Sequence, residues 1–190
     1  MRLMLVLLLV AAGNELGPAR AEADEATAWA ALRAGGHIAI MRHALAPGGG
    51  DPDNFALGDC DTQRNLSHAG RAQSRAIGNA FRAEGVAVGA VLSSAWCRCM
   101  ETAELLGFDP VVPAPMLNSF FRDRSKAPAQ IAKIQLYLSE PRNGPAHVLV
   151  THQVNITGVT GIFPHSGEIV VTRPVGGSFT VVGRILITAN

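Results

Sequence analysis

The chain is organised around the stretch Ile38-Ala39-Ile40-Met41-Arg42-His43-Ala44, an apolar run that ends in a cation and an imidazole. An Arg-His pair alone carries little information, because most such pairs are ordinary surface residues. Two further apolar runs, however, also lead to reactive polar groups: residues 88–94 precede Arg98, and residues 147–151 precede His152. Short apolar runs of this kind are typical of buried strands. We therefore expect the polar groups that follow the three strands to meet at one edge of a sheet.

Composition limits the class of protein. The 190 residues carry a formal net charge of +1, with 48% hydrophobic and 16% charged residues. These values suit one soluble globular domain with a sizeable core, and they exclude a disordered or strongly basic chain. Aromatic residues make up only 5% of the chain, which disfavours stacking platforms for bases. We expect no nucleic-acid partner.

The N-terminus has the pattern of a secretory signal peptide. Arg2 provides a positive start, residues 3–12 are apolar, and Ala19-Arg20-Ala21 offers small residues for cleavage. The apolar stretch is about half of the ~20 residues that a membrane-spanning helix needs, so an uncleaved anchor is the weaker alternative. We predict a cleaved signal peptide over residues 1–21, a single domain over 22–190, and a periplasmic or secreted protein without a stable membrane span.

The rest of the chain alternates between strand and helix patterns. The predicted strands span 37–41, 86–92, 111–112, 146–151, 168–172 and 178–187, the last two joined by a turn at 174–177, and the predicted helices span 24–34, 68–84, 95–106, 128–138 and 155–162. This alternation predicts a three-layer α/β/α sandwich around a mostly parallel sheet. A long loop over residues 44–65 is rich in Gly, Pro and Asp. Ordered loops of that length are usually functional.

The polar groups at the expected sheet edge suit a phosphoryl group. Guanidinium groups match tetrahedral oxyanions in shape and keep their proton, and histidine can form a covalent intermediate. No Gly-rich nucleotide loop with a Lys is present, and the histidines are not paired with carboxylates at metal-ligand spacing. We therefore expect no metal and no other cofactor. The remaining histidines do not follow a strand, and we interpret them as structural: His37, His68, His147 and His165.

Four motifs, taken together, resemble the histidine phosphatase superfamily, which has the phosphoglycerate-mutase-like fold. Arg42-His43-Ala44 resembles its Arg-His-Gly signature, and residues 65–73 (Asn-Leu-Ser-His-Ala-Gly-Arg-Ala-Gln) resemble its Leu-Thr-x-x-Gly-x-x-Gln helix start. Ser93-Ser94 with Arg98 and residues 101–103 (Glu-Thr-Ala) match its second-arginine motif, and residues 148–152 match its second-histidine strand. The motifs occur in the family's order and cover nearly all of the chain after residue 37.

The resemblance implies a metal-independent phosphomonoester hydrolase that acts through a phosphohistidine. In this interpretation His43 is the nucleophile, and the phosphate pocket is formed by Arg42, Arg98 and His152. The proton donor departs from the family pattern, because Ser119 stands where members often carry Glu. We take Asp123, the nearest carboxylate, as the candidate acid. Three further carboxylates are alternatives: Asp59, Asp61 and Glu168.

Other functions remain open at this stage. A binding module that holds phosphate or a sugar phosphate without hydrolysis is the main alternative, and a mutase ranks last because no large cap insertion is present. We expect a small-molecule or envelope-linked phosphoester as substrate, because only the loops 44–65 and 113–127 can cover the pocket and an open site suits the phosphate end of a larger molecule. Small exported members of the family, similar to lipopolysaccharide-core heptose phosphatases, fit this shape. Three basic residues either recognise a second anionic group or form a solvated loop: Arg122, Arg124 and Lys126.

The three cysteines are expected to include one disulfide. Cys97 and Cys99 are two positions apart on a predicted helix and face different directions, so a bond between them is geometrically poor. In an oxidising compartment, Cys60 is expected to pair with one of the two and to pin the long loop beside Arg98. A zinc site formed by all three thiolates is the weaker alternative.

Overall fold

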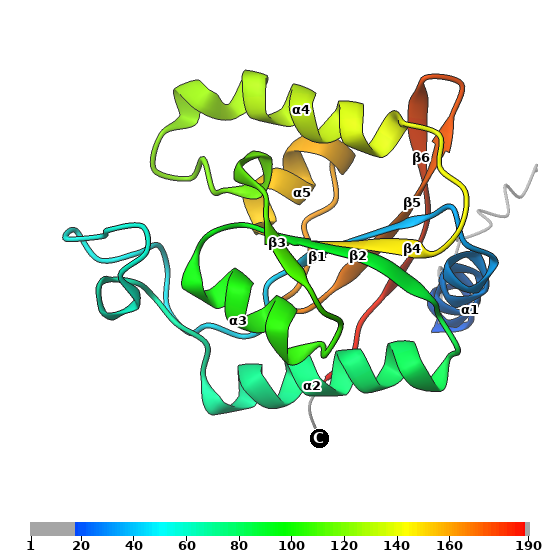
Figure 1. Ribbon diagram of the computed structural model, residues 1–190, viewed down its shortest axis with the longest axis horizontal. Coiled ribbons are helices and arrows are strands. Elements are labelled where there is room, and N and C mark those ends of the chain that lie inside the picture. Colours follow the sequence, from blue (N-terminus) through cyan, green and yellow to red (C-terminus); the bar gives the residue numbers. More distant parts are fainter. Residues whose placement is uncertain (1–17, 189–190) are drawn as a thin grey trace, which may run out of the picture.

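The computed structural model describes residues 18–188, which form a central six-stranded sheet between two layers of helices (Figure 1). The strands are β1 (Ile38–Arg42), β2 (Val88–Ser93), β3 (Val111–Pro113), β4 (Ala146–Thr151), β5 (Ile169–Val175) and β6 (Ser178–Ile185). The helices are α1 (Pro18–Ala34), α2 (His68–Ala83), α3 (Cys97–Leu105), α4 (Ala127–Ser139) and α5 (Gln153–Thr160). None of these helices is both long enough and apolar enough to cross a bilayer.

Most of the predicted signal peptide, residues 1–17, lies outside the described residues. The helix α1 begins at Pro18, earlier than the predicted start at residue 24, and includes the proposed cleavage position after Ala21. Cleavage and the boundary of the mature domain stay predictions.

The strand order is β3-β2-β4-β1-β5-β6, and the first four strands run parallel. β5 and β6 are antiparallel to their neighbours, as a mostly parallel sheet with a terminal hairpin requires. The predicted turn at 174–177 is too long, because β5 continues through Pro174 and the turn is Gly176-Gly177. Pairing of β5 with β1 ends at Thr172, so Pro174 sits where only β6 is a neighbour. A proline is tolerated there because one side of the strand is free.

The helices cover the two faces of the sheet, as the continuous burial of residues 38–41 in β1 requires. Ala39 and Met41 pack with the buried faces of α1, α2 and α3, while Ile38 and Ile40 pack with α4 and α5. Side chains of successive strand residues point to opposite faces, so a strand buried on both sides reads as a continuous apolar run. The three-layer α/β/α sandwich predicted from the sequence is confirmed.

The long loop between β1 and α2 projects from one end of the sheet, drawn in cyan in Figure 1, and is fixed at both ends. Near its start, the carbonyl of Leu45 lies so close to α2 that a Cβ atom at Gly70 would be 2.1 Å from the oxygen. Only glycine permits this approach.

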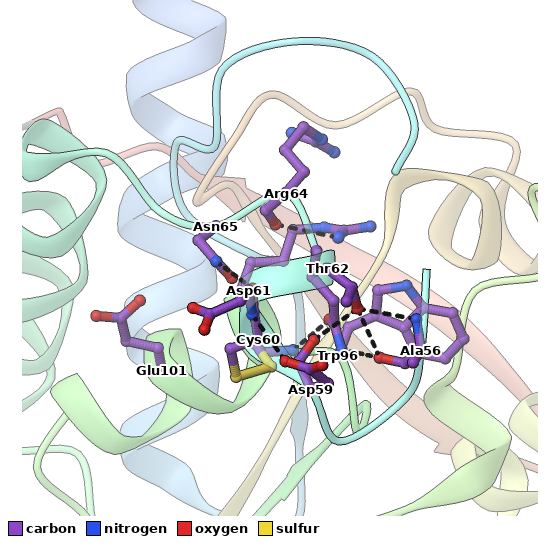
Figure 2. Close-up of a disulfide and its surroundings, with 12 residues drawn as sticks. Ala56, Asp59, Cys60, Asp61, Thr62, Arg64, Asn65, Trp96 and Glu101 are labelled. Carbon is purple, nitrogen blue, oxygen red and sulfur yellow. Dashed lines mark hydrogen bonds between the residues drawn. A yellow bond between two sulfur atoms is a disulfide. The ribbon is translucent and has the colours of Figure 1, made fainter. Parts of the chain in front are cut away.

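At its far end, a disulfide joins Cys60 to Cys97, the first residue of α3 (Figure 2). One of the two predicted pairings of Cys60 is thereby confirmed, Cys99 is free and buried, and no three-thiolate zinc site remains.

Candidate active site

The side chains predicted to converge do lie around one cavity, of about 190 Å³, at the carboxyl ends of the parallel strands. Arg42 is the last residue of β1 and His43 follows it. His152 follows β4 as the N-cap of α5, and Arg98 is the second residue of α3. The sheet therefore brings together four side chains that are separated by up to 110 positions in the sequence, and all four line the cavity.

The hydrogen bonds of His43 define which ring nitrogen faces the pocket. Nδ1 lies 2.8 Å from the carbonyl oxygen of Ala44. A carbonyl oxygen only accepts, so we assign the proton to Nδ1. Nε2 then carries a lone pair, and it accepts a hydrogen bond of 3.2 Å from Nε of Arg98. The free nitrogen of a buried imidazole is thus held toward the cavity.

The chain immediately after His43 is held by two residues of the motifs recognised in the sequence. The amide of Ala44 donates to Oγ1 of Thr102 at 3.1 Å, and the amide of Leu45 donates to Oε1 of Gln73 at 3.1 Å. Both acceptors project from helices, so the backbone that orients the imidazole has rigid supports. This arrangement gives a physical reason for the Thr in the second-arginine motif and for the Gln in the helix-start motif.

Both histidines of the pocket are neutral at neutral pH. Burial lowers the pKa of His43 to about 3, with the positive charges of Arg98 and Arg42 as further causes and the hydrogen bond to Ala44 opposing them. Burial likewise places the pKa of His152 well below its usual value, with His43 and Arg98 contributing. An unprotonated imidazole is the form that can act as a nucleophile.

His152 is fixed by a small polar network and by an aromatic contact. Its Nε2 lies 2.8 Å from Oγ of Ser94, and Oδ1 of Asn118 accepts a hydrogen bond of 2.9 Å from the amide of Ala95. Trp96 contacts the imidazole edge to face, with ring centroids 5.3 Å apart. The His152 ring lies 5.6 Å from that of His43, close enough for both to contact one phosphoryl group.

One buried N–H donor of Arg42 is unpaired among the described residues. Its Nη1 donates to the carbonyl of Pro164 at 3.1 Å, but its buried Nε has no hydrogen-bond partner in the described part of the chain. Burial and the nearby Arg98 lower the pKa of Arg42, which reflects a local excess of positive charge. Buried donors are rarely left unpaired, so the geometry suits a bound anion.

Two further charged residues line the cavity that the sequence pattern did not single out. Arg64 donates from Nε to the carbonyl of Gly50 at 2.8 Å and from Nη1 to that of Ala46. Asp51 forms a two-point ion pair with Arg98, at 2.6 Å and 3.2 Å. Both lie in the long loop, where no periodicity marks a residue as buried. The glycine run before Asp51 was the available signal, since it permits close approach of the loop.

The predicted acid is not in the pocket. Asp123 caps the short helical turn Arg124–Lys126, where it accepts hydrogen bonds from the amide and hydroxyl of Ser125 and pairs with Lys126 at 3.1 Å. Its side chain is exposed and does not line the cavity. The three alternatives do not line it either: Asp59, Asp61 and Glu168. Proximity in sequence to Ser119 was the wrong criterion, because local capping satisfies this carboxylate.

The three basic residues of loop 122–126 do not share one role. Arg122 lines the cavity and donates to the carbonyl of Pro52 at 3.0 Å, while neither Arg124 nor Lys126 lines it. Arg122 is therefore the member of the three that can meet a substrate.

We expect the buried histidines to make stability depend on pH. In the unfolded chain each histidine binds a proton as the pH falls below about 6.5, whereas folded His43 stays neutral down to about 3. The unfolded state then holds more protons, so stability is present above pH 6.5 and is lost between there and pH 3, at up to about 1.4 kcal/mol per pH unit for each such histidine. Urea unfolding at a series of pH values measures this loss.

The matched variants for that experiment are His43→Gln and His68→Gln, since the side chain of His68 is exposed. The first should flatten the decline in unfolding free energy below pH 6.5, and the second should leave it unchanged. Parallel curves of unfolding free energy against pH for the parent protein and both variants would contradict the expected link between histidine protonation and stability.

Comparisons with known proteins agree with the geometry. Residues 38–119 match the family model described as histidine phosphatase superfamily, branch 1. No curated protein sequence matches the chain. The structure of the protein histidine phosphatase SixA complexed with tungstate is similar at a TM-score of 0.57 and 18% identity, over 78% of this chain and 96% of that one.

Two other solved structures share the fold. A SixA protein from Agrobacterium tumefaciens aligns with a TM-score of 0.55 and 17% identity, over 80% of this chain and 98% of that one. A mutant phosphoserine phosphatase from Entamoeba histolytica in complex with phosphoserine aligns with a TM-score of 0.51 and 13% identity, over 78% and 95%. These likenesses confirm the fold class predicted from the sequence.

Proposed function

We propose that this chain, which carries the fold and, over residues 38–119, the sequence pattern of the histidine phosphatase superfamily, is a phosphomonoester hydrolase that acts through a phosphohistidine at His43. One observation carries the proposal: the unprotonated Nε2 of His43 is held in a cavity lined by four arginines. A nucleophile beside concentrated positive charge suits attack on a phosphoryl group. The tungstate complex of the structural neighbour SixA supports it, because tungstate is a tetrahedral oxyanion like phosphate.

In the first step, the lone pair of His43 Nε2 forms a bond to phosphorus, and the bond from phosphorus to the leaving oxygen breaks. The phosphoryl oxygens are held by Arg42, whose buried Nε is unpaired, and by Arg98 and His152. As the phosphoryl group binds, the N–H of Arg98 Nε transfers its hydrogen bond from His43 to a phosphoryl oxygen. Donors that stabilise developing charge in this way contribute roughly 3–4 kcal/mol each.

In the second step, water attacks phosphorus, the bond from nitrogen to phosphorus breaks, and phosphate leaves. Nδ1 keeps its proton throughout because it donates to Ala44, so Nε2 returns as the free nucleophile. The backbone therefore fixes one tautomer for both steps.

Protonation of the leaving group limits the choice of substrate. The carboxylate among the lining residues is Asp51, and its hydrogen bonds and charge interaction with Arg98 outweigh burial and lower its pKa, so it is a poor proton donor. Substrates with a good leaving group need less help from an acid. We therefore favour aryl phosphates, acyl phosphates and phosphohistidine, either as small molecules or attached to a larger envelope component.

We also propose that the protein works in the periplasm or outside the cell. The sequence pattern of residues 1–21 and the Cys60–Cys97 disulfide both support export, because disulfides persist mainly in oxidising compartments.

Trapping of the phosphoenzyme tests the proposed function. The protein is mixed with a ³²P-labelled aryl phosphate, quenched in alkaline detergent, and analysed for label on the chain. We expect label that survives base and is lost in acid, as a phosphoramidate requires, and that maps to the peptide containing His43. Binding of inorganic phosphate with neither label nor release of the aryl alcohol would overturn the proposal and favour the phosphate-binding module.

A further inference from the structure

The residue of interest is Asp51, whose side chain is almost as deeply buried as that of the arginine it contacts. The exposed fractions of the Arg98 and Asp51 side chains are 4% and 5%. Resting on the proposed function, we infer that Asp51 is a positioning residue, whose carboxylate holds the Arg98 guanidinium in the orientation that serves His43 and the phosphoryl group.

The surroundings of Asp51 suit an ionised carboxylate. Oδ1 accepts from Nη1 of Arg98 at 2.6 Å and from the amide of Arg64 at 3.2 Å. Oδ2 accepts from Nη2 of Arg98 and from Nε1 of Trp96, both at 3.2 Å. Four donors match the hydrogen-bonding capacity of a carboxylate. Asp51 therefore has its acceptors in use and is not arranged to exchange a proton with substrate.

The five N–H groups of Arg98 are divided between Asp51 and the pocket. Two point at Asp51, one from Nη1 and one from Nη2. The other hydrogen of Nη1 reaches the carbonyl of Arg64 at 3.3 Å, and Nε donates to His43. This leaves the second hydrogen of Nη2 for a phosphoryl oxygen, and Nε joins it once its hydrogen bond is transferred from His43. The carboxylate thus fixes one side of the guanidinium and presents the other side to the nucleophile.

Asp51 also offsets a local excess of positive charge. Arg42, Arg64 and Arg98 line one small cavity, and the pKa values of the first two are lowered by burial and by the charge of Arg98. Without a carboxylate, Arg98 would be driven away from the other two guanidinium groups. A buried counter-charge holds it in place, which side-chain packing alone would not do.

The contacts that hold the loop around Asp51 favour a fixed partner of Arg98 over a carboxylate that substrate displaces from the pocket. The loop that carries Asp51 is tied to Arg64 through the carbonyls of Gly50 and Ala46. The Cys60–Cys97 disulfide joins the same loop to the residue before Arg98, so the loop that carries the carboxylate is covalently linked to the helix that carries the guanidinium. Figure 2 shows this disulfide with Arg64 and Trp96, two of the residues that donate to Asp51, nearby.

Asp51→Asn tests the inference through steady-state kinetics with an aryl phosphate. An amide keeps the shape but loses the charge and one acceptor, so kcat should fall roughly 10- to 100-fold. KM should stay equal or decrease, because a negative charge near the dianion has been removed. A carboxylate that only competes with substrate also predicts a lower KM, but with kcat unchanged or raised, and an unchanged or raised kcat would overturn the inference.

Asp53→Asn is the matched control on the same loop. The Asp53 side chain is fully exposed and lies 3.8 Å from Arg122. We expect its kinetic constants to match those of the parent protein. A second comparison uses Arg98→Lys, in which the two-point pair is already lost. There, adding Asp51→Asn should change kcat by less than about twofold, whereas a full additional loss would show that Asp51 acts independently of Arg98.

A readout independent of turnover separates this inference from the proposed function. The ¹⁵N resonance of His43 Nε2 reports its hydrogen bond with Arg98. It should move in Asp51→Asn, move similarly in Arg98→Lys, and stay in place in Asp53→Asn. A protein with no phosphatase activity that shows this pattern would disprove the proposed function and keep the positioning role. An unmoved resonance in a folded Asp51→Asn protein would overturn the positioning role alone.

Discussion

His43→Ala is expected to lower kcat for an aryl phosphate by a factor on the order of 10⁴ or more, because the atom that forms the bond to phosphorus is removed. Water is the remaining nucleophile, and Asp51, the carboxylate that lines the pocket, is not free to activate it, since its pKa is lowered and its oxygens are occupied. Release of the aryl alcohol, followed by absorbance at high protein concentration, measures the loss.

Two controls make that result specific. His68→Ala removes an exposed histidine at the start of α2 and should retain full activity. The His43→Ala protein should still bind inorganic phosphate in calorimetry, because the four arginines of the cavity are unchanged. Turnover within tenfold of the parent protein would exclude His43 as the nucleophile.

Removal of the disulfide is expected to cost stability on the order of 4 kcal/mol. The bond links residues 37 positions apart, and closing a loop of that length restricts the unfolded chain. Small domains are stable by about 5–15 kcal/mol, so the loss is a large share of the total. The double variant Cys60→Ala, Cys97→Ala should show a correspondingly lower unfolding free energy in urea.

Reduction provides the control for this prediction. Dithiothreitol should destabilise the parent protein by a similar amount and leave the double variant unaffected. Cys99 should not react with a thiol reagent in the folded protein, because its thiol is buried and burial raises its pKa to about 12. Equal unfolding midpoints for the parent protein and the double variant would contradict the expected contribution of the disulfide.

The sequence predicted the sheet well because each buried strand is a continuous apolar run with a clear end. Residues 38–41 must face two helical layers at once, and only a central strand meets that condition. The convergence of His43, Arg98 and His152 then followed from the rule that parallel strands share one carboxyl edge.

Arg64 and Asp51 could not be predicted in the same way, because their positions depend on how a loop of some twenty residues folds back. No spacing rule relates residue 51 to residue 98, and the contact depends on glycine conformations, on the disulfide and on hydrogen bonds to loop carbonyls. Asp123, the candidate acid, does not line the cavity for the converse reason. A carboxylate close to the expected position was satisfied by its own neighbours, and local capping competes with any distant role.

The contacts of Trp96 have an optical consequence. Its indole donates to Asp51, stacks on Phe55 at 5.1 Å between ring centroids and meets His152 edge to face, so one fluorophore contacts two of the residues that line the pocket. The second tryptophan of the chain, Trp29, is on α1 and packs in the core against Phe81. We therefore expect emission from Trp96 to respond to the charge state and occupancy of the pocket, and emission from Trp29 to stay unchanged.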